Sequence, residues 1–446
     1  MAETGKTVAV VGAGWAGCSA AVELARAGCK VTLFEASRSL GGRARGVELR
    51  GAMLDNGQHI LLGAYRETLR VLRTVGIAPA AALLKLPLQM RYPPGSGGMD
   101  FRAPRLPAPL HLVGALLRAS GLEWADKLSL ARFSTSARWM DWHLNTDCSV
   151  SELLERFDQT PRLVRLMWRP LCLAALNTAP ERASAQVFLN VLRDSLGAAR
   201  PASDMLLPRL DLGTLFPDAA ARYVERHGGS VRRGAKVARL VRQARRWQVE
   251  ASGELAGGCY DGVVLATAPG AAAALLPAGA LADQLGGFAH EPITTCYLQY
   301  PAATRLALPF YALLDDPARA HWGQFVFDRG QLDARQAGLL SVVISASGAA
   351  AALDRTVLAQ ALAAQLAAVL GRPELAAPEW TQVITEKRAT FACTPALARP
   401  ANATGLAGLV LAGDYTASAY PATLEAAVRS GKLAAAALLA PGAEGE

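Results

Sequence analysis

The sequence predicts an α/β protein in which a Rossmann-like nucleotide-binding domain is interleaved with a second, α+β domain. Three observations predict it: a strand–turn–helix–strand unit near the N-terminus, a second glycine-marked strand near the C-terminus, and a long intervening region of helical and alternating patterns. A chain of 446 residues, 52% of them hydrophobic, exceeds what one compact core usually holds, so two domains are expected.

The first nucleotide-binding unit begins with the apolar run 7–11, which leads into a G-x-G-x-x-G turn and a helix over 18–27. In such a turn, Gly12 permits the tight bend, Gly14 lets the backbone approach a pyrophosphate, and Gly17 lets helix and strand pack closely. A second strand, 30–34, ends at a glutamate that can accept hydrogen bonds from ribose hydroxyls and would repel a 2′-phosphate. A dinucleotide site is therefore expected at Gly12, Ala13, Gly14, Trp15, Ala16, Gly17, Glu35 and Ala36.

Two further segments extend this site. The run 40–45, Leu-Gly-Gly-Arg-Ala-Arg, is a flexible turn followed by guanidinium groups such as Arg43 that can offset diphosphate charge, and its alternative is a solvated basic loop. Near the other end of the chain, an apolar run leads into Gly413 and Asp414, and the stretch from Tyr420 to Ala427 follows as the entrance to a helix. A buried hairpin with a capping aspartate is the alternative for this second segment.

This set of motifs resembles the flavin amine oxidase and phytoene desaturase superfamily. The resemblance implies one FAD held by both ends of the chain, in a Rossmann-like domain of the glutathione-reductase type. It also implies that Asp414, with Gly413, binds the pyrophosphate–ribityl region, that Leu424, with Thr423, lies near the isoalloxazine, and that the backbone at Val237 contacts the adenine.

Three segments favour a narrower resemblance, to the hydroxysqualene dehydroxylase family, also described as squalene-associated FAD-dependent desaturases of hopanoid pathways. They are 55–65 (Asp-Asn-Gly-Gln-His-Ile-Leu-Leu-Gly-Ala-Tyr), 167–171 with 176–178, and 386–391 (Glu-Lys-Arg-Ala-Thr-Phe). In this resemblance Gly57, Gln58 and His59 also contact the flavin. Reduced flavin would give hydride to the carbinol carbon of hydroxysqualene as water leaves, yielding squalene.

That reaction needs an acid, because hydroxide leaves poorly from a dry site. The candidates in matching segments are His59, Lys387, Glu386 and Tyr420, and His59 comes first because it titrates nearest neutrality. The alternative for His59 is a hydrogen bond to the flavin or the backbone, and Asp55 is equally expected to fix a turn by accepting backbone N–H bonds.

Other functions stay open from the sequence. A carotenoid or phytoene desaturase shares nearly every flavin motif and removes hydride instead of delivering it. A flavin amine oxidase usually presents an aromatic cage, whereas residues 421–424 read Pro-Ala-Thr-Leu. A non-catalytic flavin-binding protein of the membrane surface is a third possibility. No second G-x-G-x-x-G follows a strand, so the electron donor is left unassigned.

The expected division of the chain is 1–85, 206–285 and 395–446 for the FAD-binding domain, and 86–205 and 286–394 for the substrate-binding domain. Helices are expected over 65–75, within 126–196, and over 210–229 and 356–370. Strands are expected over 235–241, 247–251 and 262–266, and, in a second sheet, over 294–300, 324–327 and 339–345.

A membrane surface is the expected large partner. Residues 101–122 combine leucines with arginines and are predicted as a helix lying in the lipid interface; packing on its own domain is the alternative. A thirty-carbon isoprenoid, at about 0.8 kcal/mol per carbon, would cost roughly 20 kcal/mol to move from lipid into water, which favours direct uptake from the bilayer.

The net charge, the N-terminal sequence and the cysteines narrow the expected location and partners of the protein. The net charge of +9 is dispersed and carries no nucleic-acid-binding signature. No secretory leader is recognisable, and seven scattered cysteines form no C-x-x-C, which favours a reduced compartment and no metal site. We therefore expect a cytoplasmic protein peripherally associated with the inner face of the cell membrane.

Overall fold

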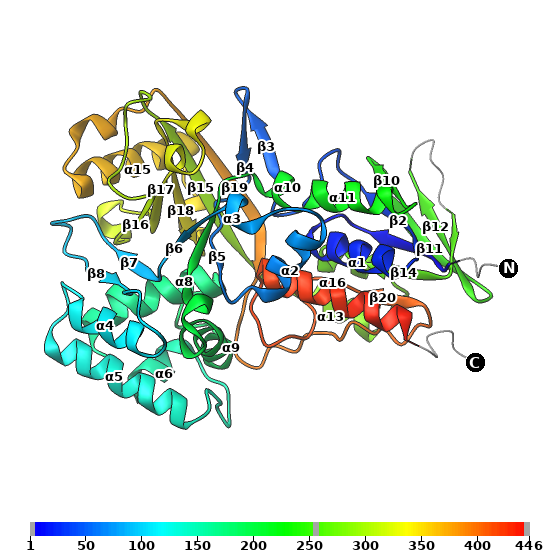
Figure 1. Cartoon of the computed structure of the whole chain (residues 1–446), viewed down its shortest axis with the longest axis horizontal. Helices are drawn as coiled ribbons and strands as arrows, with labels where there is room; N and C mark the ends of the chain where they lie inside the picture. Colours follow the sequence, from blue (N-terminus) through cyan, green and yellow to red (C-terminus); the bar gives the residue numbers. More distant parts are fainter. Residues whose placement is uncertain (1–4, 253–257, 441–446) are drawn as a thin grey trace.

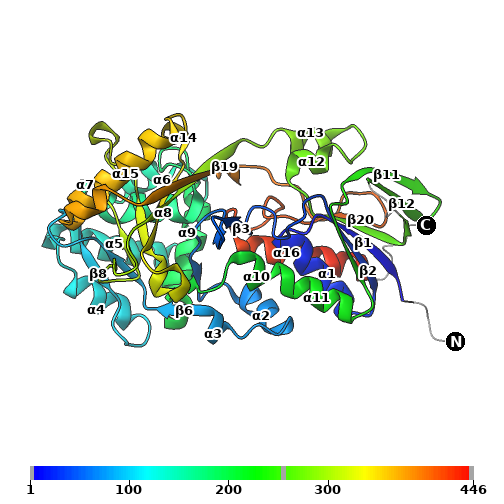
Figure 2. The same ribbon diagram turned by 90° about the horizontal axis from the view of Figure 1, so that it is seen from above.

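The computed structural model describes residues 5–252 and 258–440. A parallel sheet with its helices occupies one end of the molecule, near both termini, and an antiparallel sheet with a block of helices occupies the other (Figures 1 and 2). The chain passes between the two ends several times, because strands from its beginning, middle and end share the parallel sheet.

The parallel sheet has five strands in the order β10 (Ser230–Arg233), β2 (Lys30–Glu35), β1 (Thr7–Val11), β14 (Gly262–Leu265) and β20 (Leu409–Leu411). The central strands are almost wholly buried, as expected where both faces of a parallel sheet are covered. Helix α1 (Trp15–Arg26) packs between α11 (Pro217–Arg226) and α16 (Leu424–Leu439) (Figure 1). An antiparallel three-stranded sheet of β11 (Val237–Gln243), β12 (Arg246–Ala251) and β13 (Cys259–Tyr260) packs against β1 and β14.

The antiparallel sheet has the order β16 (Phe310–Ala312), β17 (Phe325–Asp328), β18 (Leu339–Ser345), β15 (His290–Gln299) and β19 (Trp380–Phe391). Helix α15 (Arg355–Leu370) covers one face, where Leu358, Leu362 and Leu366 meet side chains of β15 and β18. The other face contributes Phe310, Phe325 and Phe327 to the core shared with the helical block. That block comprises α5 (Trp124–Trp139), α6 (Val150–Arg156), α7 (Pro161–Leu163), η1 (Val164–Trp168), α8 (Arg169–Leu176), α9 (Ala185–Leu192) and η2 (Arg193–Gly197).

Short elements connect the two ends. A hairpin of β3 (Gly46–Leu49) and β4 (Ala52–Asp55) is followed by a small sheet in the order β5 (Leu61–Leu62), β9 (Met205–Pro208) and β6 (Leu83–Leu86), and by the pair β7 (Gln89–Arg91) and β8 (Asp100–Arg102). The remaining elements are α2 (Arg66–Thr74), α3 (Pro79–Ala82), η3 (Arg200–Ser203), α12 (Pro269–Ala273), α13 (Ala280–Gly286), η4 (Pro317–Arg319), η5 (Arg329–Gln331), η6 (Ala334–Gln336), α14 (Gly348–Ala351) and η7 (Pro373–Ala376).

Two predicted helices are wrong in extent. Residues 101–122 are not one helix: β8 ends at Arg102, a loop containing Pro104 and Pro107 follows, and α4 spans only Leu110–Arg118. Proline lacks the N–H that a helix interior needs, and it restricts the residue before it. The predicted helix 210–229 is likewise divided at Phe216 into α10 (Leu212–Leu215) and α11.

The other predicted helices and strands are confirmed to within a few residues at their ends. The interleaving of the two sheets supports the predicted domain boundaries, which we propose as stated. None of the helices in the described residues is long and apolar enough to cross a bilayer.

Candidate active site

The glycine turn between β1 and α1 has the shape that an anion-binding loop requires. Gly12 has φ of +101°, and a Cβ there would lie 2.7 Å from the Ala266 carbonyl oxygen. At Gly17 a Cβ would lie 1.9 Å from the Gly12 carbonyl oxygen, so that position also requires glycine. Among the described residues, no heavy atom beyond its chain neighbours lies within 4 Å of a Cβ built at Gly14, and no side chain caps α1. Open space in front of an uncapped helix N-terminus fits a diphosphate.

The second glycine turn packs directly against the first. The Gly41 N–H donates to the Ala13 carbonyl at 2.8 Å, and the indole N–H of Trp15 donates to the Ala44 carbonyl at 3.1 Å. The side chains of Trp15 and Ala16 are buried. The run 40–45 is therefore packed against the first glycine turn and is not a detached basic loop.

Glu35 lies beside the first turn at the end of β2. Its Oε2 accepts from the Ala13 N–H and its Oε1 from the Ser37 N–H, both at 2.8 Å, while Ala36 is exposed. The Ala235 N–H donates to the Glu35 carbonyl at 2.9 Å, which brings the start of β11, with the buried Val237, to the same place. The residues predicted for the adenosine half are thus brought together.

Arg43 joins the two ends of the chain. Its Nη2 donates to Asp414 Oδ1 at 2.6 Å, and its Nη1 donates to the Ala389 carbonyl of β19 at 2.8 Å. The exposed fractions of the two charged side chains are 34% for Arg43 and 8% for Asp414. The backbone N–H of Gly413 donates to Ser430 Oγ of α16 at 2.9 Å. Arg43 and Asp414 therefore tie the two ends of the chain together, as the predicted clamp on the cofactor requires, and Arg43 also holds strand β19 of the antiparallel sheet.

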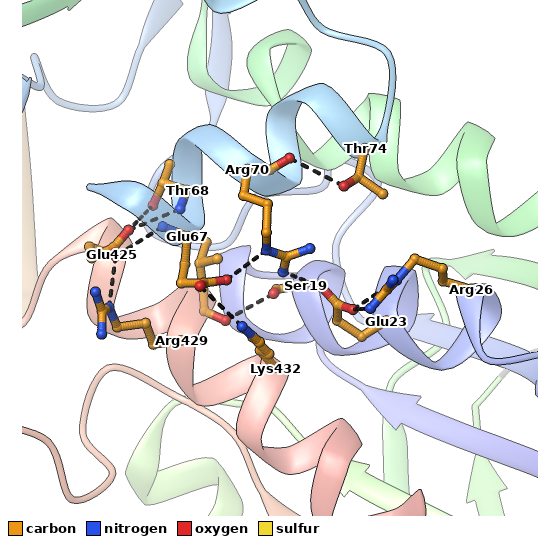
Figure 3. Close-up of polar contacts among 11 residues, drawn as sticks. Ser19, Glu23, Arg26, Glu67, Thr68, Arg70, Thr74, Glu425, Arg429 and Lys432 are labelled. Carbon is orange, nitrogen blue, oxygen red and sulfur yellow. Dashed lines mark hydrogen bonds and ion pairs between the residues drawn. The ribbon is translucent and has the colours of Figure 1, made fainter. Parts of the chain in front are cut away.

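The entrance of α16 is fixed by a buried carboxylate (Figure 3). Thr423 caps α16 by accepting from the Ala426 N–H at 3.2 Å, and Leu424 is the first residue of the helix. The carboxylate of Glu425, 1% exposed, accepts from the N–H groups of Glu67 and Thr68 at 3.1 and 2.9 Å, from the Thr68 hydroxyl at 2.8 Å and from Arg429 Nε at 2.7 Å.

Glu425 thereby caps α2, which has no side-chain cap of its own. Two ion pairs add to this contact: Lys432 of α16 with Glu67 at 3.0 Å, and Arg70 of α2 with Glu23 of α1 (Figure 3). Helices α1, α2 and α16 are therefore held as one unit around the predicted flavin-binding residues Thr423 and Leu424.

His59 is held by the backbone carbonyl of Gly57, two residues earlier in the chain. Its Nδ1 lies 2.8 Å from the Gly57 carbonyl oxygen, and because a carbonyl only accepts, Nδ1 carries the proton. Burial lowers the pKa of His59 below its ordinary value, and the Gly57 carbonyl opposes this effect. At neutral pH the ring is neutral with a lone pair on Nε2. This geometry favours the hydrogen-bonding alternative over the proton-donor prediction.

The neighbouring Gln58 is anchored across the molecule. Its Oε1 accepts from Arg329 Nη1 at 2.7 Å, and Arg329 is 1% exposed. Thr295 of β15 lies against Gly57, and its hydroxyl, although buried, has no hydrogen-bond partner among the described residues. A buried hydroxyl of this kind needs a partner, which a bound group beside Gly57 can supply.

Asp55 accepts a backbone N–H, as the alternative interpretation predicted, but from a residue 157 positions away at the start of α10 and not within a local turn. Its Oδ1 accepts from the Leu212 N–H at 2.7 Å, and Tyr297 donates its hydroxyl to the Asp55 carbonyl at 2.8 Å. Burial raises the pKa of Asp55 to about 7, while the Arg329 charge opposes this shift.

The other three proton-donor candidates lie in different surroundings. The Tyr420 hydroxyl donates to Asp194 Oδ2 at 2.5 Å, and burial together with Asp194 raises the pKa of Tyr420 to about 12. Glu386 is half-buried and accepts from the Arg388 N–H at 3.3 Å, whereas Lys387 is exposed. No hydrogen bond within residues 5–252 and 258–440 joins any of these three side chains to His59.

Several residues of the site were missed from the sequence. Arg329, Asp194 and Ser430 sit in no motif, and nothing in their local sequence signals that they anchor Gln58, Tyr420 and Gly413. Asn177 lies in segment 176–178, one of those that favoured the narrower resemblance, and the structure shows what its side chain contacts. With φ of +48°, it donates to Thr390 Oγ1 at 2.9 Å and accepts from the Ala346 N–H at 2.6 Å, so segments 176–178 and 386–391 are in direct contact.

Comparison with known proteins identifies the family. The family model for flavin containing amine oxidoreductases matches residues 15–439. The chain belongs to this family. Family members are FAD-dependent oxidoreductases, and the predictions of FAD, enzyme class and fold are confirmed.

Within the family, the chain is similar to two curated hydroxysqualene dehydroxylases. It is 31% identical to the protein of Rhodopseudomonas palustris, over 98% of this chain and 99% of the relative, and 30% identical to that of Sinorhizobium fredii, over 96% and 97%. Among solved structures, a putrescine oxidase double mutant aligns with a TM-score of 0.72 at 17% identity, covering 97% of this chain and 99% of that one. The two proteins therefore share the fold.

Proposed function

We propose that this flavin oxidoreductase removes the hydroxyl group of hydroxysqualene reductively, releasing water and yielding squalene. The observation that carries the proposal is full-length similarity to two hydroxysqualene dehydroxylases. The contact of Asn177 with Thr390 supports it, because it joins two of the segments that favoured this family in the sequence. The flavin amine oxidase alternative is less favoured, since residues 421–424 offer no aromatic side chain.

We propose that the residues predicted from the motifs hold FAD. The α1 N-terminus at Gly14 would bind the diphosphate, Glu35 the ribose, and the Arg43–Asp414 pair would fix the junction of both ends of the chain. Reduced FAD, when bound, supplies the hydride that replaces the hydroxyl at the carbinol carbon. The protein must supply one proton to the leaving oxygen and keep water out.

His59 comes first among the predicted donors of that proton, ahead of Lys387, Glu386 and Tyr420, although its geometry in the structure favours the hydrogen-bonding role. Because His59 is neutral with a bare Nε2, it can donate from Nε2 only after protonation. If it is the acid, the dehydroxylation rate rises as the pH falls below the ordinary histidine pKa. An unchanged rate for His59→Ala at every pH would exclude it and leave the hydrogen-bonding role.

The reaction is tested with purified, FAD-loaded protein under anaerobic conditions. Detergent-solubilised hydroxysqualene with reduced FAD should give squalene, and phytoene with oxidised FAD should give no desaturated product. Desaturated phytoene without any squalene would establish the carotenoid desaturase alternative. Bound FAD with no turnover of either isoprenoid would instead indicate a flavin-binding protein without catalysis.

We further propose that the protein attaches peripherally to the inner, cytoplasmic face of the cell membrane. Of the twelve large hydrophobic side chains that are strongly exposed among the described residues, seven lie on or beside α4 and α5: Leu106, Leu110, Val113, Leu117, Trp124, Leu128 and Trp139. These helices lie at the end of the molecule away from both termini (Figures 1 and 2). A substrate that costs roughly 20 kcal/mol to bring into water supports this attachment.

The attachment has a matched test. Val113→Asp with Leu117→Asp should abolish co-sedimentation with liposomes, because both side chains are about half exposed, at 49% and 57%. The control, Val357→Asp with Leu433→Asp, changes the same residue types at equal exposure, 53% and 54%, on α15 and α16. Equal binding by both double variants would refute the attachment through α4. Leu116, in contrast, packs partly against the core and is a poor target.

A further inference from the structure

A strongly cationic cavity of about 780 Å³ lies beside α4. Its walls come from the end of β6, from β7 and β8, from the loop before α4, from the C-terminal end of α4 and from η3. Six basic side chains line it against two aspartates, a formal net charge of +4: Lys85, Arg91, Arg102, Arg105, Arg118 and Arg200 against Asp100 and Asp204. A cavity of this charge attracts an anion.

Half of these cations are already paired. Arg91 makes a two-point contact with Asp100 at 2.7 and 2.8 Å, and Asp204 receives Lys85 at 2.8 Å and Arg200 at 3.5 Å. The structure gives no carboxylate partner, in the part of the chain that it describes, to three lining residues: Arg102, Arg105 and Arg118. The buried Nε of Arg200 also has no acceptor among those residues. Unmatched guanidinium donors around one cavity are suited to a group with several acceptor oxygens.

The cavity adjoins the apolar face of α4 and α5. Leu110, Val113 and Leu117 follow one another at three- and four-residue spacing on the outer side of α4. Lys127 of α5 donates to the Leu117 carbonyl at 3.0 Å and lies 5.5 Å from the ring centroid of Trp124, which makes the two helices one surface. Arg105 directly precedes the exposed Leu106, and Arg118 directly follows Leu117.

We propose that this cavity binds the phosphate of an anionic phospholipid headgroup while the apolar face beside it enters the boundary between headgroups and acyl chains in the same leaflet. A lipid presents a phosphate immediately above its acyl chains, and the structure presents unmatched arginines immediately beside exposed leucines. Arg102, Arg105 and Arg118 hold the phosphate oxygens. The inference rests on the proposed membrane attachment and assigns to it a specific lipid contact.

The test compares two triple variants of the FAD-loaded protein. Arg102→Gln, Arg105→Gln and Arg118→Gln remove three charges at the cavity. Lys30→Gln, Arg73→Gln and Arg226→Gln remove three exposed charges on the FAD-binding side that have no ion-pair partner in the described structure. Partition is measured on phosphatidylcholine vesicles containing phosphatidylglycerol, and on phosphatidylcholine vesicles brought to the same surface potential with oleate.

Each cavity arginine removed should weaken partition onto the phosphatidylglycerol vesicles about fivefold, and the control triple variant should keep most of its binding. The wild type should prefer phosphatidylglycerol to oleate at equal surface potential, and soluble glycerol phosphate should not displace it from the vesicles. Equal losses for both triple variants, or no preference over oleate, would overturn the proposal in favour of general electrostatic attraction. Displacement by glycerol phosphate would overturn it in favour of a soluble phosphate ligand.

Turnover of detergent-solubilised hydroxysqualene separates this inference from the proposed reaction. The cavity variants should keep wild-type turnover and FAD content, because their residues lie outside the flavin clamp. Loss of vesicle binding with normal turnover therefore tests the lipid site alone, whereas absence of turnover in the wild type would count against the proposed reaction only.

Discussion

Arg43 is the position where a single substitution should separate the two ends of the chain. Arg43→Met leaves the 92% buried carboxylate of Asp414 without its partner and removes the donor to the Ala389 carbonyl. Breaking a buried ion pair from one side costs about 3 to 5 kcal/mol, and the 34% exposure of Arg43 places this pair at the lower end. We expect the folded state to be destabilised by about 3 kcal/mol, with loss of FAD on purification.

The assay is urea unfolding of the FAD-loaded protein followed by circular dichroism, together with the flavin content of each preparation. Arg43→Met, Asp414→Asn and the double variant form a cycle, in which the double variant should be more stable than the sum of the single losses predicts. Arg335→Met is the control, because its partner Asp333 lies at 2.9 Å but Arg335 is 83% exposed, so solvent screens the pair and little or no loss of stability is expected. Wild-type stability and flavin content in Arg43→Met would refute the clamp.

Three further outcomes are expected. Gly14→Ala should lose FAD but keep the urea midpoint of FAD-free wild type, because its Cβ enters open space in front of α1, whereas Gly17→Ala should also lower that midpoint, because its Cβ meets the Gly12 carbonyl; purified flavin content and circular dichroism distinguish them. Glu425→Ala should destabilise the protein by about 2 kcal/mol, measured by urea unfolding, since two capped N–H groups of α2 and Arg429 lose their acceptor; an unchanged midpoint would contradict the capping role. Asp55, with its pKa raised to about 7, holds a proton in the folded state that the unfolded chain releases near pH 4, so its contribution to stability is lost as the pH rises through about 7. Asp55→Asn should flatten that dependence between pH 5 and 8, and an unflattened profile would show that another group causes it.

The flavin half of the site could be predicted because its signals are local. The glycines at 12, 14 and 17 follow an apolar strand, and Glu35 ends the next one, so a window of about thirty residues contains the turn, the helix and the acid. Backbone conformations that only glycine tolerates leave a trace in the sequence itself. The strands of the second sheet could also be predicted locally, because the alternation of their side chains is visible within each segment.

Residues 101–122, predicted as one interfacial helix, are where the local sequence pattern misled the prediction. Its leucines and arginines have the periodicity of a helix, but three prolines lie between Arg102 and Leu110, and the helix starts only after the last of them. The apolar character was predicted correctly and its extent was not. The adjoining cavity was not predicted at all, because its basic residues come from five separate stretches between Lys85 and Arg200.

The sequence alone determined that a dinucleotide turn, a matching acid and a second glycine-marked strand are present, since each depends on the backbone preferences of neighbouring residues. Only the tertiary structure decided which side chains meet: Arg43 with Asp414, Gln58 with Arg329, and Tyr420 with Asp194, which are 371, 271 and 226 positions apart. Such pairs depend on how two sheets and a helical block pack against one another, and a hydrogen bond between distant residues imposes no periodicity on either segment. For the same reason the sequence nominated His59 as an acid, while the fold tied its proton to the Gly57 carbonyl.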